Sequence, residues 1–292
     1  MTIDETSVSR APALVGKADF SELYVRPDPN ALFDVLSPLQ YQVPQHALPV
    51  IEQVLARGGG GTVLDVCCSY GLNAALLCHD LDLVELGKWM TAPERQALST
   101  AEIIEQDRAM FARRRRRTDL CVLGLDTSGP AVEYARRAEL IANGWSEDLE
   151  CDAPSEQLAQ GITNVDVLVC TGGVGYVGAS TFDHIFRAIA RPSEAWVVAS
   201  VLRAVDYRPI ANALRRYGLQ TRKVPGGPVR QRQFISAEEA TSAVAQAVST
   251  GHDVAGLEES GWFYADIYVS GASGFIDDLR LNSPSGLGKH DG

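Results

Sequence analysis

The sequence lacks the features of exported and membrane-embedded proteins. No apolar run in its 292 residues reaches the roughly 20 residues that a membrane-spanning helix needs. The first residues, 1–17, show no basic segment followed by an apolar one, as a secretory signal would require. We therefore expect a soluble protein of the cytoplasm.

Positive charge is also scarce. The chain has 26 Lys and Arg residues against 37 Asp and Glu residues, which gives a formal net charge of −11. Binding to nucleic-acid phosphates or to a membrane surface depends on clustered positive charge. Residues 113–117 are five consecutive arginines, but consecutive residues point all round a helix and form no single face. We interpret them as a solvated helix end and expect no nucleic-acid or membrane partner.

Metal-ligand pairs are missing from the sequence. None of its cysteines forms a Cys-x-x-Cys pair, and most lie in apolar, strand-like runs. Zinc sites need paired ligands at short spacing, so we expect no metal. Buried, reduced thiols are the expected state of the cysteines. The six are Cys67, Cys68, Cys78, Cys121, Cys151 and Cys170.

Apolar periodicity predicts one large α/β domain. The short apolar runs typical of buried strands are residues 62–66, 120–125, 165–170, 195–202 and 262–269. Helical patterns cover residues 44–56, 130–143, 180–189, 209–217 and 237–248. Because strands and helices alternate, we expect a mostly parallel sheet with helices on both faces. Ligands of such sheets bind beyond the carboxyl ends of the strands.

The chain ends and one internal segment differ from this pattern. Residues 1–18 and 283–292 are polar and aperiodic, and we expect them to be disordered. Residues 19–44 are expected to form an N-terminal cap, and residues 45–282 the α/β domain. Within that domain, residues 81–118 are predicted to be a helical insertion, either a lid over the site or a hairpin without a function.

The first strand leads into a turn of small residues. Asp65 is followed by Cys67, Cys68, Ser69, Tyr70 and Gly71, and a helix begins after them. Small residues let the backbone approach a ligand closely. The plain structural alternative is a buried strand that enters a helix through a tight turn.

Acidic residues follow the next two segments. Asp126, with Thr127 after it, comes at the end of the second strand, where a carboxylate can accept hydrogen bonds from ribose hydroxyls. Asp152 follows about 26 residues later. Each acid is equally compatible with a helix cap, for Asp152 that of a helix starting near Pro154.

The fourth strand ends in a glycine-rich loop. Thr171 is followed by three glycines within four residues and then by Tyr176. An aromatic ring face attracts a cation by about 0.5–2 kcal/mol, depending on desolvation. The alternative is a core tyrosine.

Taken in this order, the motifs resemble those of the class I S-adenosylmethionine (SAM)-dependent methyltransferases. The resemblance covers residues 45–270 and implies a Rossmann-like fold with a mostly parallel, seven-stranded sheet. The chain departs from the family in its Gly-x-Gly-x-Gly turn, because Cys67 and Ser69 stand at the first two glycine positions and only Gly71 is kept. We expect these replacements to make the loop stiffer and narrower.

The resemblance implies a set of SAM-binding residues. These are Asp65, Cys67, Ser69, Gly71, Asp126, Thr127, Asp152 and Thr171. Asp126 corresponds to the family's ribose-binding acid, and Asp152 to its adenine-contacting residue. Tyr176 would border the sulfonium and serve as the catalytic residue. Tyr24 and Tyr41, in the cap, are candidates for the substrate pocket.

Three functions remain open at this point. The first is methyl transfer to a small molecule, since the loop and cap resemble a bacterial subgroup of natural-product pathways. The second is cyclisation of SAM to azetidine-2-carboxylate and methylthioadenosine, because known azetidine-2-carboxylate synthases resemble methyltransferases. The third is a non-catalytic SAM-binding regulator. Candidate bases are His79, His184 and Asp206, each of which is also compatible with an ordinary surface or core role; a homodimer is one option for the assembly.

Overall fold

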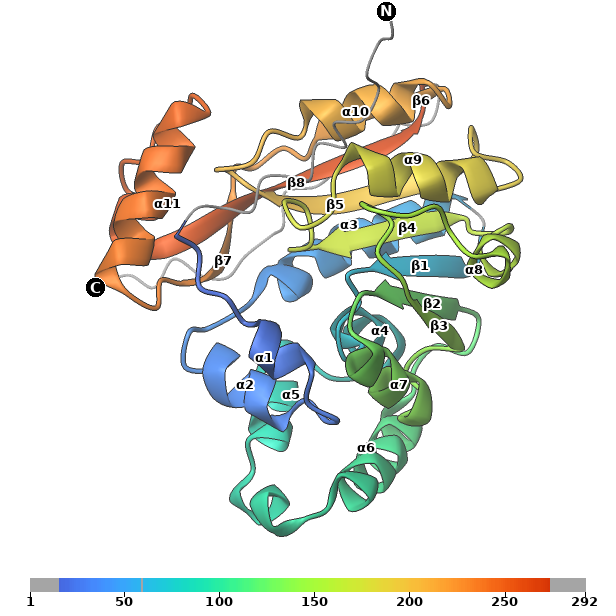
Figure 1. Ribbon diagram of the computed structural model, residues 1–292, viewed down its shortest axis with the longest axis vertical. Helices are drawn as coiled ribbons and strands as arrows, with labels where there is room; N and C mark the ends of the chain where they lie inside the picture. Colours follow the sequence, from blue (N-terminus) through green and yellow to red (C-terminus); the bar gives the residue numbers. More distant parts are fainter. Residues whose placement is uncertain (1–15, 59, 274–292) are drawn as a thin grey trace, which may run out of the picture.

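Eight strands form one twisted sheet between two layers of helices (Figure 1). The computed structural model describes residues 16–58 and 60–273. The strands are β1 (Thr62–Val66), β2 (Cys121–Asp126), β3 (Asn143–Ser146), β4 (Val167–Thr171), β5 (Trp196–Leu202), β6 (Leu219–Lys223), β7 (Val229–Gln233) and β8 (Trp262–Ala272). Their order is β3-β2-β1-β4-β5-β8-β6, and β7 pairs with β8.

The predicted fold class is confirmed. Strands β1 to β5 are mutually parallel, and β8 runs antiparallel to β5, β6 and β7. The sheet has one strand more than the seven expected, because β7 adds to β8. The chain passes from β1 to β2 on one side and later to β4 on the other, so the winding direction reverses between β1 and β4. Crevices at such a reversal are the usual ligand sites of doubly wound sheets.

The helices surround this sheet. They are α1 (Ser21–Tyr24), α2 (Asn30–Leu36), α3 (Val43–Gly58), α4 (Leu72–Cys78), α5 (Leu83–Met90), α6 (Thr100–Arg114), α7 (Gly129–Arg137), α8 (Glu156–Gly161), α9 (Ala179–Ala188), α10 (Arg208–Arg215) and α11 (Ala237–Ser249). Two short 3-10 helices are η1 (Pro93–Ala97) and η2 (Glu258–Ser260). Among the described residues, none of the helices has the length and apolar character needed to cross a membrane.

Successive residues of the strands face different helical layers. Val63 of β1 packs in a buried cluster with α3, α4 and α7, whereas Leu64 belongs to a second cluster with α8, α9 and α10. This alternation follows from the pleat of a strand. Asp65, two residues after Val63, therefore faces the α4 side, where it meets the first turn of that helix.

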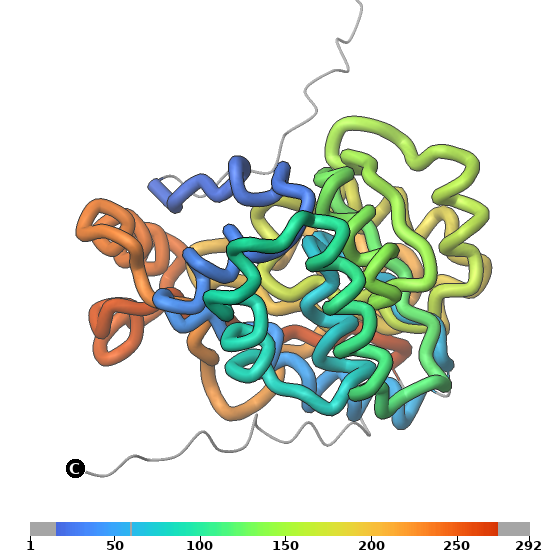
Figure 2. The backbone as a smooth tube through the Cα atoms, turned by 90° about the horizontal axis from the view of Figure 1, so that it is seen from below, coloured from blue at the N-terminus to red at the C-terminus, as the bar shows by residue number. Residues whose placement is uncertain are grey.

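The predicted helical insertion consists of α5, η1 and α6. Figure 2 shows it between the N-terminal segments and the part of the chain around α7. Its centre is the buried carboxylate of Asp107, which pairs with Arg95 of η1 at 2.7 Å. The same carboxylate accepts hydrogen bonds from Trp89 of α5 at 2.6 Å and from Tyr134 of α7 at 2.7 Å. One buried charge thus fastens the insertion to α7.

The arginine run caps backbone carbonyls at the base of the insertion. Helix α6 ends at Arg114, so most of the run is not helical. Arg114 donates to the carbonyl oxygen of Asp80, Arg115 to that of Glu139 and Arg116 to that of Leu76. These contacts give the run a local structural role at the end of α6.

Replacing Asp107 should destabilise the protein. Asp107→Ala leaves the buried Arg95 guanidinium without its carboxylate, and breaking a buried pair in this way costs about 3–5 kcal/mol. Urea unfolding measures the loss. The matched control is Glu105→Ala on the same helix, since the Glu105 side chain is 67% exposed in its pair with Arg108. Equal unfolding midpoints for Asp107→Ala and the control would contradict this assignment.

Candidate functional site

The turn after β1 keeps a glycine-like backbone although two of its glycines are replaced. Cys67, Ser69 and Gly71 have φ angles of 59°, 52° and 84°. A left-handed conformation costs a non-glycine residue about 1–2 kcal/mol. Such strain persists only where surrounding contacts impose it, typically at functional sites. Cys67 and Ser69 therefore adopt, at an energetic cost, a backbone conformation that favours glycine.

Asp126, at the end of β2, holds this loop in place. Its carboxylate accepts the backbone N–H of Ser69 at 2.8 Å and that of Ser128 at 2.9 Å. It is partly exposed, and burial raises its pKa above the ordinary value. The side chain of Ser128 caps α7, and Thr127 is exposed beside it. The acid thus joins the two turns that begin α4 and α7.

Asp65 carries a buried oxygen without a partner. Its side chain is fully buried, and Oδ1 accepts a hydrogen bond from Asn73 at 2.8 Å. Asn73 in turn accepts one from the hydroxyl of Thr171, at the end of β4, at 2.9 Å. Oδ2 has no hydrogen-bond partner among the described residues. Burial raises the pKa of Asp65 to about 7, although Asn73 counteracts part of that effect.

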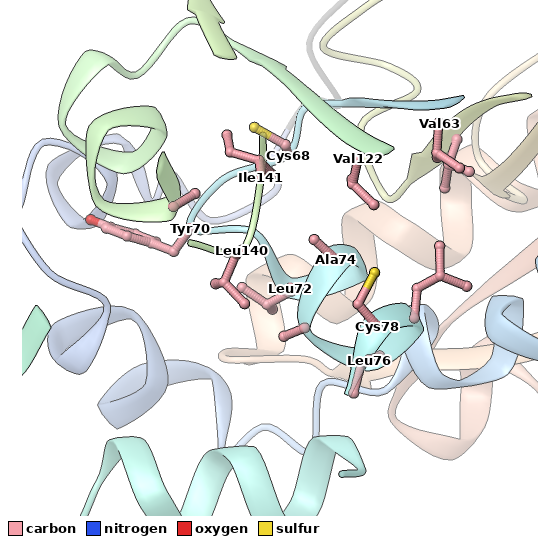
Figure 3. Close-up of a cluster of buried hydrophobic side chains, with 14 of the residues drawn as sticks. Val63, Cys68, Tyr70, Leu72, Ala74, Leu76, Cys78, Val122, Leu140 and Ile141 are labelled. Carbon is pink, nitrogen blue, oxygen red and sulfur yellow. The ribbon is translucent and has the colours of Figure 1, made fainter. Parts of the chain in front are cut away.

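Two buried side chains anchor the loop from below. Figure 3 shows Cys68 beside Ile141 and Tyr70 turned away from α4. The Tyr70 hydroxyl lies 2.7 Å from the carbonyl oxygen of Leu23 and 2.9 Å from that of Arg26. Because Leu23 and Arg26 belong to the predicted cap, the loop is tied directly to the segment that covers the site.

The glycine-rich loop after β4 packs tightly against the loop after β1. A side chain at Gly173 would come within 2.7 Å of the Cys67 sulfur and 2.8 Å of the Cys170 sulfur. The side chain of Cys67, in the loop after β1, thus fills the space beside Gly173, where the loop after β4 has no side chain. The Cys170 thiol, followed by burial, raises the pKa of Cys67 well above its usual range, so Cys67 stays a neutral thiol.

A tyrosine-rich wall covers the outer side of the site. Tyr24, Tyr41 and Tyr176 lie close to one another, and burial, followed by neighbouring charges, raises the pKa of both Tyr24 and Tyr41 far above the ordinary value. The Lys17 ammonium lies 4.7 Å from the centre of the Tyr176 ring. Burial, followed by Arg232, lowers the Lys17 pKa to about 8. A cation therefore already rests on the ring that the sequence analysis assigned to a sulfonium.

The N-terminal segment, residues 17–24, lies next to these tyrosines and contacts α11 and the start of α7. It runs from the base of α11 to α1, along the edge toward which the arrowhead of β4 points (Figure 1). The backbone N–H of Ala18 donates to Glu239 of α11 at 2.8 Å, and the Ser128 hydroxyl donates to the carbonyl oxygen of Tyr24. Residues 17 and 18, which the sequence assigned to a disordered tail, are thus held in place. The rest of that tail, residues 1–15, and residues 283–292 lie outside the described residues.

Some predicted residues lie apart from this cluster. Asp152 is exposed, and the cap of α8 is Ser155 rather than Asp152. The sequence analysis missed Glu150, whose buried carboxylate accepts hydrogen bonds from Gly178 and Thr181 at the start of α9. The spacing from Asp126 does not distinguish Glu150 from Asp152, because both lie in the same turn. In the structure this turn buries Glu150 and leaves Asp152 exposed.

The three candidate bases have structural roles. His79 lies at the far end of α4 from the site, where its ring is 5.2 Å from that of Phe111. His184 bonds to the carbonyl oxygen of Leu149, and Asp206 pairs with Arg208. Asp65 and Asp126 are the acids at the site whose pKa burial raises, and the pKa of Asp65 rises to about 7.

None of the six cysteines forms a disulfide, and Cys121 and Cys151 are exposed rather than buried as expected. Within the described residues, no group of three or more His, Cys, Asp and Glu side chains is arranged to hold a metal ion.

Comparison with known proteins adds the following. The sequence matches no protein-family model and no curated protein. Similar solved structures include a TehB-like SAM-dependent methyltransferase from Corynebacterium glutamicum, which is 16% identical, with 76% of this chain and 86% of that chain covered and a TM-score of 0.39. Another is magnesium protoporphyrin IX methyltransferase from Synechocystis with bound S-adenosylhomocysteine (SAH). It is 12% identical, with 88% of this chain and 89% of that chain covered and a TM-score of 0.41.

The raised pKa of Asp65 should make stability depend on pH. The folded protein binds this proton more tightly than the unfolded chain, since the pKa rises from 3.8 to about 7. The resulting stabilisation is complete below about pH 4 and is lost as the pH rises through 7. At about 1.4 kcal/mol per pH unit, the wild-type protein should lose about 2–3 kcal/mol between pH 5 and pH 7.5 that Asp65→Asn does not lose. Urea unfolding at both pH values tests this, and parallel pH profiles of the two proteins would contradict it.

Proposed function

We propose that this protein is an enzyme that binds SAM at the reversal between β1 and β4 and transfers its methyl group to a small molecule. One observation carries the proposal. The strained loop 67–71 packs against Gly173, whose carbonyl oxygen accepts the N–H of Tyr176, and Asp65, which has one unpartnered oxygen, is linked through Asn73 to Thr171 at the end of β4. We place the reaction in natural-product biosynthesis, as the cofactor loop suggests.

The three parts of SAM have matching groups in this site. The partly exposed carboxylate of Asp126 suits the ribose hydroxyls, because its oxygens keep lone pairs beyond the bonds to Ser69 and Ser128. The unpartnered Oδ2 of Asp65 suits the α-ammonium. The Tyr176 ring is 56% exposed, and its face attracts cations, as the Lys17 ammonium at 4.7 Å illustrates; the sulfonium would take the place of that ammonium.

Methyl transfer needs alignment more than acid or base chemistry. The nucleophile of the acceptor forms a bond to the methyl carbon, the sulfur–methyl bond breaks, and its electron pair stays on sulfur to give SAH. Positive charge on sulfur disappears in this step, so enclosure away from water favours it. The N-terminal segment and the three tyrosines supply such enclosure, and holding the reactants in line supplies the rest.

A groove beside the site has the size of a small-molecule pocket. Its volume is about 640 Å³, and its lining includes Phe33, Leu36, Leu83 and Tyr41. Small-molecule pockets typically measure about 300–1,000 Å³ and are mostly apolar. Tyr41 borders both this groove and the β4 end, where its hydroxyl lies 3.2 Å from the Cβ position of Gly172. The groove therefore supports a small acceptor that approaches past Tyr41.

A second reaction, cyclisation of SAM, is favoured by the state of Asp65. With a pKa of about 7 and a free Oδ2, Asp65 can accept a proton from the α-ammonium. The neutral amine then bonds to the γ-carbon, the bond from that carbon to sulfur breaks, and the electron pair leaves with sulfur. The products are azetidine-2-carboxylate and methylthioadenosine.

Asp126→Ala should weaken SAM binding at least about ten-fold, because it removes both the ribose acceptor and the anchor of the Ser69 N–H. Isothermal titration calorimetry measures the change. Glu133→Ala on α7 is the matched control, since Glu133 is exposed and pairs with Arg136 only on the surface. Unchanged affinity in Asp126→Ala would reject the role of Asp126, and absence of SAM binding by the wild-type protein would reject the proposed function.

Incubation with SAM and no acceptor separates the two reactions. Mass spectrometry should find SAM intact if the enzyme transfers its methyl group to an absent acceptor. Equal amounts of methylthioadenosine and azetidine-2-carboxylate would establish cyclisation instead. In that case Asp65→Asn should slow product formation by about 100-fold or more, because the base is lost. A reaction without enzyme controls for spontaneous decay of SAM.

A further inference from the structure

We propose that the groove between α2, α3 and α5 takes a neutral, largely apolar methyl acceptor, and that Nδ1 of His46 recognises a hydrogen-bond donor on it. This inference rests on the proposed function and deepens it, because it names the class of methyl acceptor and a residue that selects it. His46 lies in α3 and was not among the candidate residues of the sequence analysis.

The helices that form the groove are tied to one another. Helices α2 and α5 lie side by side (Figure 1). A side chain at Gly87 of α5 would come within 3.2 Å of the Ser37 hydroxyl at the end of α2. The backbone N–H of Leu83, at the start of α5, donates to the side chain of Gln45 in α3 at 2.9 Å. The groove of about 640 Å³ is therefore preformed, as small-molecule sites usually are.

The lining of the groove suits a neutral ligand. Its apolar side chains include Phe33, Leu36 and Val84, and Val84 is 65% exposed. Among the described residues, the charged side chains of the lining are Asp82 and Lys88, one of each sign, and both are exposed. Transfer of an ion from water to an apolar surface without a partner is costly. The groove therefore favours an uncharged molecule with an apolar body.

One hydrogen bond determines which nitrogen of the His46 ring carries the hydrogen. The side-chain nitrogen of Gln42 donates to the carbonyl oxygen of Gln40 at 3.1 Å, which fixes the orientation of the Gln42 amide. The amide oxygen then lies 2.9 Å from Nε2 of His46. Because an amide oxygen only accepts, Nε2 must be the donor. In the neutral ring the lone pair is therefore on Nδ1.

Nδ1 of His46 remains available as a hydrogen-bond acceptor. The ring is half-buried and lines the groove, and Nδ1 has no hydrogen-bond partner among the described residues. Burial, followed by the nearby charge of Arg230, lowers the pKa of His46, so the ring is neutral at pH 7. An apolar surface with one free acceptor is complementary to an apolar molecule that carries an O–H or N–H group.

Two probes that differ in one donor test this inference on the full chain without SAM. One is β-naphthol, which has a hydroxyl, and the other is its methyl ether, which has none. Fluorescence titration measures both affinities. His46→Phe keeps an aromatic ring and removes the acceptor, so it should weaken β-naphthol binding about ten-fold and leave the ether unchanged. His46→Asn, whose side-chain oxygen can replace Nδ1, should restore most of the β-naphthol affinity.

Two further variants test whether the probes bind in the groove. Val84→Asp puts a charge in the apolar lining and should weaken both probes alike, and the exposure of Val84 lets the protein fold with this change. Glu52→Gln, also on α3, is the matched control. Glu52 pairs with Arg116 at 2.6 Å and is not part of the lining, so this variant should bind both probes like the wild type.

Several results would overturn the inference and keep the proposed function. An equal loss for both probes in His46→Phe indicates a packing role, and unchanged β-naphthol affinity in that variant excludes recognition by Nδ1. Unchanged binding in Val84→Asp would place the probes outside the groove, and a wild-type protein that binds SAM but neither probe would reject the predicted class of ligand. Failure of the wild-type protein to bind SAM would instead reject the proposed function and, with it, the groove as a methyl-acceptor site.

Discussion

The site depends on the carboxylate of Asp126, which binds the backbone of two turns at once. One oxygen accepts the N–H of Ser69 and the other that of Ser128. A hydrogen bond to a charged acceptor contributes about 1.5–3 kcal/mol, comparable to the left-handed strain of one non-glycine residue. This bond accounts for how Ser69 keeps a φ angle of 52° in a loop that has lost two glycines.

The same two turns also hold the cover of the site. Tyr70, in the strained loop, contacts the carbonyl oxygen of Leu23, and Ser128 contacts that of Tyr24. Any movement of the loop is therefore transmitted to the N-terminal segment and to the Tyr24 side chain that it carries. The coupling also explains why the loop contains a large residue, Tyr70, at a position next to its only remaining glycine.

Apolar periodicity predicted those strands whose character depends on residues that are near one another in the sequence. Periodicity located β1, β2, β4 and β5 within about two residues, because buried parallel strands are continuous apolar runs; it located the start of β8, which ends three residues later than expected. It did not locate β3, β6 or β7, and residues 229–233 of β7 are largely polar and charged and pair with β8. Lys17 was missed for a similar reason, since its partner Tyr176 lies far away in the sequence.

If SAM binds as we propose, the charge state of Asp65 bears on which reaction follows. Two ionised carboxylates would hold an α-ammonium firmly in its charged form, and a charged ammonium has no lone pair with which to attack carbon. Asp65 has a pKa of about 7, so it favours the charged form of an ammonium much less than an ordinary carboxylate does. Opening of this end to water would lower the pKa of Asp65 and strengthen its hold on the proton-bearing ammonium. Whether the amine remains a spectator or becomes the nucleophile therefore depends on how completely the tyrosine wall keeps Asp65 dry.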